Sequence, residues 1–343
     1  MARRRSRPAR TARDAPSPRG RRPGRVRGGT RGRGLPRVSS GNALGSQPNR
    51  PRSPAMPLPS PSPAAVARLA DVPALRAQVR AWREAGEAVA LVPTMGALHE
   101  GHLALVRQGR ETCRRVVVSI FVNPTQFGPS EDFSRYPRDP ERDLALLAGA
   151  GADAAYLPDV ATMYPPGFST TVSVAGLTEV LCGPLRPGHF AGVATVVTKL
   201  LLQALPDRAL FGEKDYQQLQ VIRRFVRDLD LPVTIEGVPT VREPDGLALS
   251  SRNLYLTAAE REVAPRLHAV LRDVAEAVRG GGATGPALAE GSVALAAAGF
   301  APVQYLSVND ADSLAPLERV DGPARVLAAA YLGRTRLIDN VPV

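Results

Sequence analysis

Short apolar runs alternate with amphipathic segments between residues 63 and 240, and this alternation constrains the fold more than any other feature. Residues 88–93 (AVALVP) have the pattern of a buried strand, residues 100–113 that of a helix, and residues 114–124 that of a β-branched strand. A strand, a helix and a second strand in close succession form a βαβ unit with parallel strands. We therefore predict an α/β domain over residues 63–240, a Rossmann-like, doubly wound parallel sheet.

The alternation continues along this region and then changes in character. We expect further helices over residues 66–86, 140–151, 192–205 and 215–230, and strands over residues 153–158, 207–212 and 232–239. Beyond them, residues 257–282 form one predicted helix, which Pro265 bends or breaks. Three strands follow, at residues 303–310, 324–333 and 335–343. This pattern predicts a smaller C-terminal α+β domain over residues 241–343.

Residues 1–62 differ from the rest in composition. The first 60 residues hold sixteen Arg, no Lys and one acid, Asp14, for a net charge of +15, whereas the whole chain carries +12. This Arg-, Pro-, Gly- and Ser-rich segment lacks the apolar surface that would offset its ordering entropy, so we expect disorder. An arm that binds RNA or a membrane surface and an organellar transit peptide are two alternatives. We favour a third interpretation, in which the printed sequence starts upstream of the native start codon. In that case Met56 or a nearby codon begins the protein.

The residues after this tail carry a net charge of −3 and no signal of export. No apolar stretch is long enough to span a bilayer, and no signal-peptide core is present. Cys113 and Cys182 lie far apart without a CxxC pair, which indicates neither a zinc site nor a disulfide framework. We therefore expect a cytoplasmic protein whose folded part binds neither membranes nor nucleic acid.

Residues 93–102 (PTMGALHEGH) place His99 and His102 where a helix is expected to begin. Two histidines this close suggest a metal, but zincins space them i and i+4 with the glutamate directly after the first. HEGH is one residue too short, and no third ligand stands out. A helix start presents N–H groups and a partial positive charge, which suit an anion. We interpret the pair as a phosphate site; two ordinary surface histidines are the alternative.

Two later segments carry groups that suit a nucleotide. Lys214 and Asp215 follow a predicted strand, at the edge where open α/β sheets bind ligands. The Lys would neutralise phosphate and the Asp would accept from ribose hydroxyls, although an Asp N-cap at a solvated helix start competes for Asp215. Ser250, Ser251 and Arg252 offer two hydroxyls and a guanidinium to triphosphate oxygens, although this tripeptide is common in loops.

A further pair of polar residues, Asn123 and Gln126 in FVNPTQFG, lies just past a predicted strand. Neutral amides at that place suit the hydroxyl and carboxylate groups of a small substrate. Simple turn chemistry is the alternative, because Asn-Pro is a turn signal.

Taken in order, these segments resemble the pantoate–β-alanine ligase family. The resemblance covers residues 64–343 and rests on the motifs PTMGALHEGH, FVNPTQFG, LRPGHFAGV, FGEKDYQQLQ and DGLALSSRN. More distantly, HEGH is similar to the HxGH signature of the nucleotidyltransferases that include class I aminoacyl-tRNA synthetases. The resemblance implies ATP-dependent condensation of pantoate with β-alanine to pantothenate through a pantoyl adenylate, with release of AMP and pyrophosphate. It also implies Mg²⁺ and a homodimer.

The resemblance implies a role for each matching position. His102 matches the proton donor and His99 a second phosphate contact, while Lys214 and the Ser250–Arg252 segment would hold the triphosphate. The implied ATP site comprises Met95, Gly96, Ala97, Leu98, His99, Glu100, Gly101, His102, Gly212, Glu213, Lys214, Asp215, Val241, Leu249, Ser250, Ser251 and Arg252. Gln126, Gln218 and Asn123 would bind pantoate or β-alanine, and Asp143 would lie beside the metal ion. Leu249 departs from the family, which commonly has Met there, but offers similar bulk.

Two rival functions differ from this one in testable features. A nucleotidyltransferase acting on a phosphorylated acceptor would call for more basic residues than the uncharged pair Gln126 and Gln218. An RNA-binding protein that binds through its basic arm would lose its affinity for RNA when the arm is removed. The enzymatic activity of a ligase would survive the same truncation.

Overall fold

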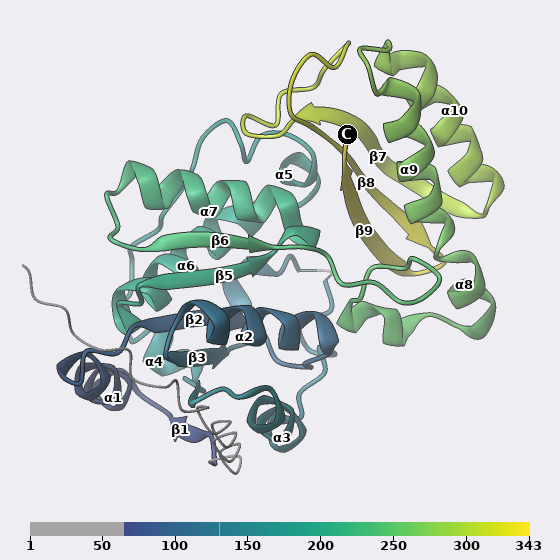
Figure 1. Cartoon of the computed structure of the whole chain (residues 1–343). Coiled ribbons are helices and arrows are strands. Elements are labelled where there is room, and N and C mark those ends of the chain that lie inside the picture. Colours follow the sequence, from purple (N-terminus) through teal and green to yellow (C-terminus); the bar gives the residue numbers. More distant parts are fainter. Residues whose placement is uncertain (1–64, 130) are drawn as a thin grey trace, which may run out of the picture. The chain divides into compact units, whose positions relative to one another are not determined.

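The computed structural model describes residues 65–129 and 131–343, which hold two separate β-sheets with their own helices (Figure 1). The predictions for residues 1–62, a disordered tail and a native start near Met56, lie outside the described residues. The boundary at residue 241 stays a prediction, although the larger sheet lies wholly before it and the smaller sheet wholly after it.

The larger sheet has six parallel strands. Its spatial order is β1 (Ala67–Leu69), β4 (Ala154–Tyr156), β3 (Arg115–Ile120), β2 (Val89–Thr94), β5 (Arg208–Gly212) and β6 (Thr234–Val238). The middle strands β2 and β3 are rich in Val and almost fully buried, as expected for strands covered on both faces.

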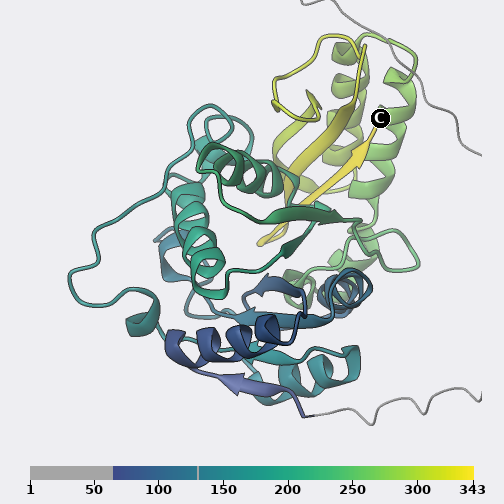
Figure 2. The ribbon, with the colours of Figure 1, turned by 60° about the vertical axis from the view of Figure 1, so that its left-hand side comes forward.

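Helices cover both faces of this sheet (Figures 1 and 2). Along β2, Val89 and Leu91 share one core with α1 (Val72–Glu84), α6 (His189–Ala204) and α7 (Tyr216–Asp228). The alternate residues of β2, Ala90 and Val92, pack in a second core with α2 (Glu100–Thr112) and α3 (Pro140–Ala150). Because successive side chains of a strand point to opposite faces, the sheet has helices on both sides. The predicted doubly wound architecture is confirmed.

The start of the first predicted helix was wrong. Ala67–Leu69 form β1 and pair with β4, and α1 begins only after Asp71, whose carboxylate accepts from the N–H of Ala74 at 2.8 Å. A strand of three residues is too short to interrupt the helical periodicity that follows it. Between β4 and α6 lie two further short helices, α4 (Val160–Met163) and α5 (Cys182–Leu185).

The smaller sheet is antiparallel, with β7 (Phe300–Asp310), β8 (Ala324–Leu332) and β9 (Thr335–Pro342) in that order. Its core includes residues of α9 (Arg266–Val278) and α10 (Thr284–Ala297), so the predicted α+β domain is confirmed. Pro265 breaks the expected long helix into α8 (Ala258–Val263) and α9. The sequence prediction missed α10, whose many Ala and Gly residues give no clear apolar stripe.

Candidate active site

The predicted ligand-binding segments meet at the middle of the parallel sheet. β2 and β5 are neighbours, but β2 leads through α2 to β3 on one side, whereas β5 leads through α7 to β6 on the other. Such a reversal of strand order opens a crevice at the carboxyl ends of the two strands. His99 follows β2 and Lys214 follows β5, so both segments lie at this crevice.

His99 and His102 hold each other at the N-terminus of α2. His99 is the N-cap, and its Nδ1 accepts from the backbone N–H of Gly101 at 3.2 Å. The Nδ1 of His102 accepts in turn from the backbone N–H of His99 at 3.3 Å, and the two ring centroids lie 4.1 Å apart. Because each Nδ1 accepts a hydrogen bond, the proton of each neutral ring resides on Nε2. The pair therefore has two Nε2–H donors for a ligand.

Burial keeps both rings uncharged. The pKa of His99 falls to about 4, first because the ring is buried and then because of the charge on Lys214. Burial and the neighbouring His99 lower the pKa of His102 to about 3. At neutral pH both rings thus donate hydrogen bonds as neutral imidazoles, and the positive charge of the site comes from other residues.

The carboxylate of Asp143 is engaged by the main chain of the loop before α2. Its side chain is 1% exposed, and its two carboxylate oxygens accept from the backbone N–H groups of Ala97 at 2.9 Å and Leu98 at 2.8 Å. These bonds hold the loop between β2 and α2, in which Gly96 and Ala97 both have positive φ values, 81° and 51°. Asp143 does not line the cavity; its observed contacts hold this loop, and its place beside a metal ion stays a prediction.

Lys214 lies in η2 (Glu213–Asp215), a single turn between β5 and α7 that the C-terminal sheet holds in place. The side-chain amide of Asn340 on β9 donates to the carbonyl oxygens of Glu213 and Lys214. The ammonium of Lys214 lies 3.8 Å from the carboxylate of Asp215. Burial acts to raise the pKa of Asp215, but the charges of Lys214 and Arg252 outweigh it and lower the pKa.

Ser251 and Arg252 lie in η3 (Ser251–Tyr255), which follows Ser250. Ser250 is its N-cap, and the hydroxyls of Ser251 and Tyr136 lie 3.2 Å apart. The guanidinium of Arg252 makes two hydrogen bonds to Asp132, at 2.9 and 3.2 Å, which fix its plane. Although burial acts to lower the pKa of Arg252, Asp132 raises it, so the guanidinium is charged.

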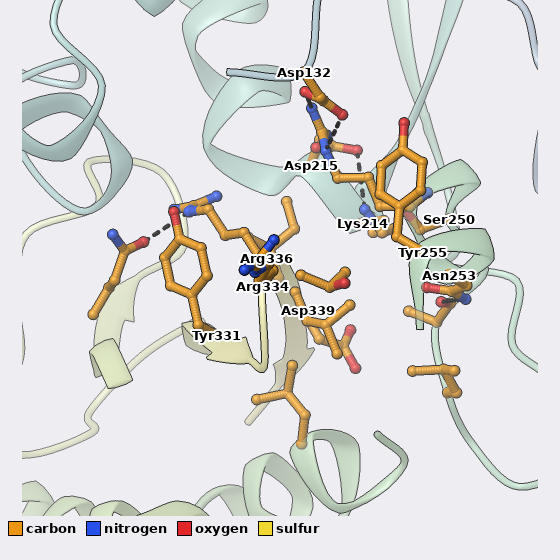
Figure 3. A pocket seen from close by; sticks show the side chains of 18 of the residues that line it. Asp132, Lys214, Asp215, Ser250, Asn253, Tyr255, Tyr331, Arg334, Arg336 and Asp339 are labelled. Atoms are coloured by element: carbon orange, nitrogen blue, oxygen red, sulfur yellow. Dashed lines mark hydrogen bonds and ion pairs between the residues drawn. The ribbon is translucent and has the colours of Figure 1, made fainter. Parts of the chain in front are cut away.

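These walls enclose a cavity of about 230 Å³. Of the predicted residues, those that line it are Met95, His99, Gly101, His102, Asn123, Gln126, Gly212, Lys214, Asp215, Gln218, Val241, Leu249, Ser250, Ser251 and Arg252. A second cavity, of about 300 Å³, shares Lys214, Asp215 and Arg252 with the first. It extends to β8 and β9, from which Tyr331, Arg336 and Asp339 line it (Figure 3).

Five predicted ATP-site residues line neither cavity: Gly96, Ala97, Leu98, Glu100 and Glu213. The first three form the loop that Asp143 holds. Glu100 is exposed and forms an ion pair with Arg107, and the Glu213 carboxylate accepts from Arg325 at 2.7 Å.

Asn123 is buried, and both ends of its amide are engaged by the protein. Its Nδ2 donates to the side-chain oxygen of Gln126 at 3.0 Å and to the carbonyl of Gly192 at 3.2 Å. Its Oδ1 accepts from the hydroxyl of Tyr164 at 2.7 Å. Asn123 therefore holds the side-chain oxygen of Gln126, whose Nε2 donates to the sulfur of Met95 at 3.2 Å.

Several residues at the site were not predicted. Arg186 and His189 line the cavity, and both belong to the motif LRPGHFAGV, which served only to indicate the resemblance. Asp132, Tyr136 and Asn340 hold predicted residues from positions far along the chain. The motif was the only sequence signal for the first two, and no local pattern marks the other three.

Residues 65–129 and 131–343 contain no group of three or more His, Cys, Asp or Glu side chains that could hold a metal ion by themselves. Over the same residues, no helix is long and apolar enough to cross a membrane.

A family model and two related proteins match most of this sequence. Residues 67–342 match the family model described as pantoate-beta-alanine ligase. The pantothenate synthetase of Paramagnetospirillum magneticum is 63% identical over 272 residues, which cover 79% of this chain and 96% of that protein. The pantothenate synthetase of Acidiphilium cryptum is 62% identical over 274 residues, covering 80% of this chain and 98% of that protein.

Solved structures agree with this match. A crystal structure of pantothenate synthetase from Thermus thermophilus is 51% identical in sequence, with a TM-score of 0.77, and covers 80% of this chain and 99% of that one. The pantoate-beta-alanine ligase of Francisella tularensis, solved in complex with Beta-gamma ATP and β-alanine, is 33% identical with a TM-score of 0.69. It covers 81% of this chain and 97% of that chain.

Proposed function

We propose that this chain, which belongs to the pantoate–β-alanine ligase family, performs that reaction with the residues gathered at the crevice between β2 and β5. The enzyme is an AMP-forming ligase: it condenses pantoate with β-alanine to pantothenate and cleaves ATP to AMP and pyrophosphate. The observation that carries the assignment of residues is the cavity into which the His99–His102 pair, Lys214 and Arg252 converge.

In the first step the carboxylate of pantoate attacks the α-phosphorus of ATP. A bond forms between that oxygen and phosphorus, the bond to the β-phosphate breaks, and pyrophosphate leaves. Negative charge builds on the phosphoryl oxygens, so fixed donors stabilise the transition state most. The Nε2–H groups of His99 and His102 and the ammonium of Lys214 supply such donors, and the locked imidazole pair needs no reorganisation.

Ser250, Ser251 and Arg252 would hold the departing end of the triphosphate. The ion pair with Asp132 fixes the plane of the Arg252 guanidinium, which suits two parallel hydrogen bonds to phosphate. Gly212, Asp215 and Val241 line the same cavity and would surround the adenosine. Leu249 adds an apolar side chain to that wall.

Gln126 and Gln218 would hold pantoate by its hydroxyl and carboxylate oxygens. Both line the cavity, and Asn123 holds the side-chain oxygen of Gln126, so that its NH₂, which has one hydrogen besides the one donated to Met95, would donate to pantoate. In the second step the amine of β-alanine attacks the acyl carbon beside Gln126, the bond from that carbon to the phosphate oxygen breaks, and AMP leaves. The attacking nitrogen loses one of its protons to water as the amide forms.

We include Mg²⁺ in the proposal as the partner of the nucleotide. When bound, the ion would neutralise phosphate charge, and it characteristically keeps several waters and few protein ligands. Residues 65–129 and 131–343 contain no group of three or more His, Cys, Asp or Glu side chains that could hold an ion, so the proposal gives the ion phosphate and water ligands. A homodimer and a cytoplasmic location belong to the proposal on the family resemblance, and light scattering of the purified protein tests the first.

The deciding experiment measures AMP formation from ATP by the purified chain. Release is expected only with both pantoate and β-alanine, while pantoate alone should support exchange of labelled pyrophosphate into ATP. Exchange without pantoate, or release with a phosphorylated acceptor in its place, would contradict the assignment.

A further inference from the structure

His189 lines the cavity on the side of Gln126, and the proposed mechanism gives it no role. It is the first residue of α6. Its Nδ1 lies 2.8 Å from the carbonyl oxygen of Gln126, and its Nε2 lies 3.0 Å from Nη1 of Arg186. A guanidinium nitrogen can only donate, so Nε2 accepts. The ring proton is therefore on Nδ1, which donates to the carbonyl of Gln126.

Arg186 is itself fixed. Its Nε and Nη2 donate to the two carboxylate oxygens of Glu131 at 2.7 and 2.6 Å, a bidentate pair that holds the guanidinium in one plane. Burial acts to raise the pKa of Glu131, but Arg186 outweighs it and lowers the pKa, so the carboxylate stays ionised at neutral pH. The pKa of His189 falls to about 4 through burial and the charge of Arg186, so the ring is neutral. One tautomer of His189 is thereby selected.

The helix α6 approaches Gln126 closely because Gly192 has no side chain. A Cβ on Gly192 would lie 2.4 Å from the carbonyl oxygen of Thr125 and 2.8 Å from the backbone nitrogen of Gln126. The turn η1 (Pro124–Gln126) therefore rests directly on the first turn of α6. The imidazole of His189 reaches the main chain of Gln126 across this contact, while Asn123 holds the side-chain oxygen of the same residue.

We propose that His189 is a positioning residue for Gln126: its Nδ1–H fixes the main chain from which the pantoate-binding amide projects, and Arg186 with Glu131 selects the tautomer that can do so. The inference rests on the proposed function, in which Gln126 binds pantoate. Both ring nitrogens of His189 are engaged by the protein, so its effect passes through Gln126 and not through a contact of its own with substrate.

Two conservative variants separate the two ring nitrogens. In His189→Asn the side-chain NH₂ occupies the place of Nδ1–H, whereas in His189→Gln the longer amide reaches the place of Nε2. We expect His189→Ala to raise the KM for pantoate about tenfold or more, as for a displaced binding group, with the KM for ATP within about twofold. The KM for pantoate of His189→Asn should be close to that of the wild type, whereas that of His189→Gln should be raised as in His189→Ala. A KM for pantoate that is near the wild-type value in His189→Gln but raised in His189→Asn would overturn the proposal.

A double-mutant cycle with Gln126→Ala tests whether His189 acts through Gln126. In the Gln126→Ala background, adding His189→Ala should change the pantoate KM by less than about twofold; a full additive loss would overturn the proposal. If His189→Ala raised the KM for ATP and the KM for pantoate equally and lowered the melting temperature, the proposal would also be overturned, because such changes indicate a general loss of structure. If the wild-type enzyme shows no pantoate-dependent pyrophosphate exchange, the proposed function fails first, whereas an unchanged pantoate KM in His189→Ala refutes only the role of His189.

Discussion

The side-chain amide of Asn340 donates to the backbone carbonyl oxygen of Lys214 at 3.0 Å. The same Nδ2 donates to the carbonyl of Glu213 at 2.9 Å, and the Oδ1 of Asn340 accepts from Arg325 at 2.6 Å. Asn340 lies on β9 and is 3% exposed. The last strand of the C-terminal sheet thus fixes the turn that presents Lys214 to the cavity.

We expect Asn340→Ala to weaken the first step by displacing Lys214. The substitution leaves two carbonyl groups without their donor, which should lower the free energy of unfolding by about 1–3 kcal/mol. Pyrophosphate exchange at saturating pantoate should fall at least about tenfold, with a raised KM for ATP, as for a misplaced electrostatic group. A loss of stability with unchanged exchange would show that Asn340 supports the fold alone.

Lys214→Ala and His102→Ala should each slow formation of the pantoyl adenylate by about two orders of magnitude or more, the scale typical of lost transition-state donors. Exchange of labelled pyrophosphate into ATP measures this step directly. The chain offers a matched control in its other lysine, because Lys199 lies over the ring of Phe168, at 4.7 Å, and lines neither cavity. Lys199→Ala should keep wild-type exchange, and near-normal exchange in Lys214→Ala would refute the phosphate role.

Gln126→Ala should lose affinity for pantoate rather than for ATP. The amide contacts no nucleotide group in the proposal, so isothermal titration should show weaker pantoate binding and nearly unchanged ATP binding. Gln108 on α2 is a suitable control because it lines neither cavity. An unchanged response to pantoate concentration would count against Gln126 as its binding residue.

Acid should destabilise the folded protein between about pH 6.5 and 4. Unfolded histidines bind protons near pH 6.5, whereas folded His99 and His189 do so only near pH 4 and His102 near pH 3. Below pH 6.5 the unfolded chain therefore binds more protons. Stability from these rings is fully present above pH 6.5 and is lost as the pH falls toward 4, at about 1.4 kcal/mol per pH unit for each ring.

Urea unfolding across this pH range checks the prediction. His102→Asn should reduce the slope of stability against pH by about one proton. Nitrogen NMR of the wild-type rings at pH 7 should also show neutral tautomers, with the proton on Nε2 in His102 and on Nδ1 in His189. A ring that titrates near pH 6.5 would contradict the assignment for that residue.

The sequence predicted what local patterns determine. The apolar run of β3 and the contiguous PTMGALHEGH segment carry their own signals, so the parallel sheet and the helix start that presents His99 and His102 were both predictable. Strand β1, with three residues, and α10, with its small side chains, carry weak signals and were missed. The partners that fix the site are a matter of packing: 126 positions separate Asn340 from Lys214, and 63 separate His189 from Gln126. No spacing rule joins such residues before the chain has folded.

Asp143 provides the sharpest contrast between a role expected by resemblance and the contacts observed. Its carboxylate holds the N–H groups of Ala97 and Leu98, so Asp143→Ala should lower the free energy of unfolding by about 2–4 kcal/mol. The matched variant Asp143→Asn keeps one acceptor oxygen and should lose less. Because the side chain does not face the cavity, the Mg²⁺ concentration for half-maximal activity should stay within about twofold of wild type in both variants. If this Mg²⁺ concentration rose about tenfold or more while the free energy of unfolding stayed unchanged, Asp143 would act beside the metal ion.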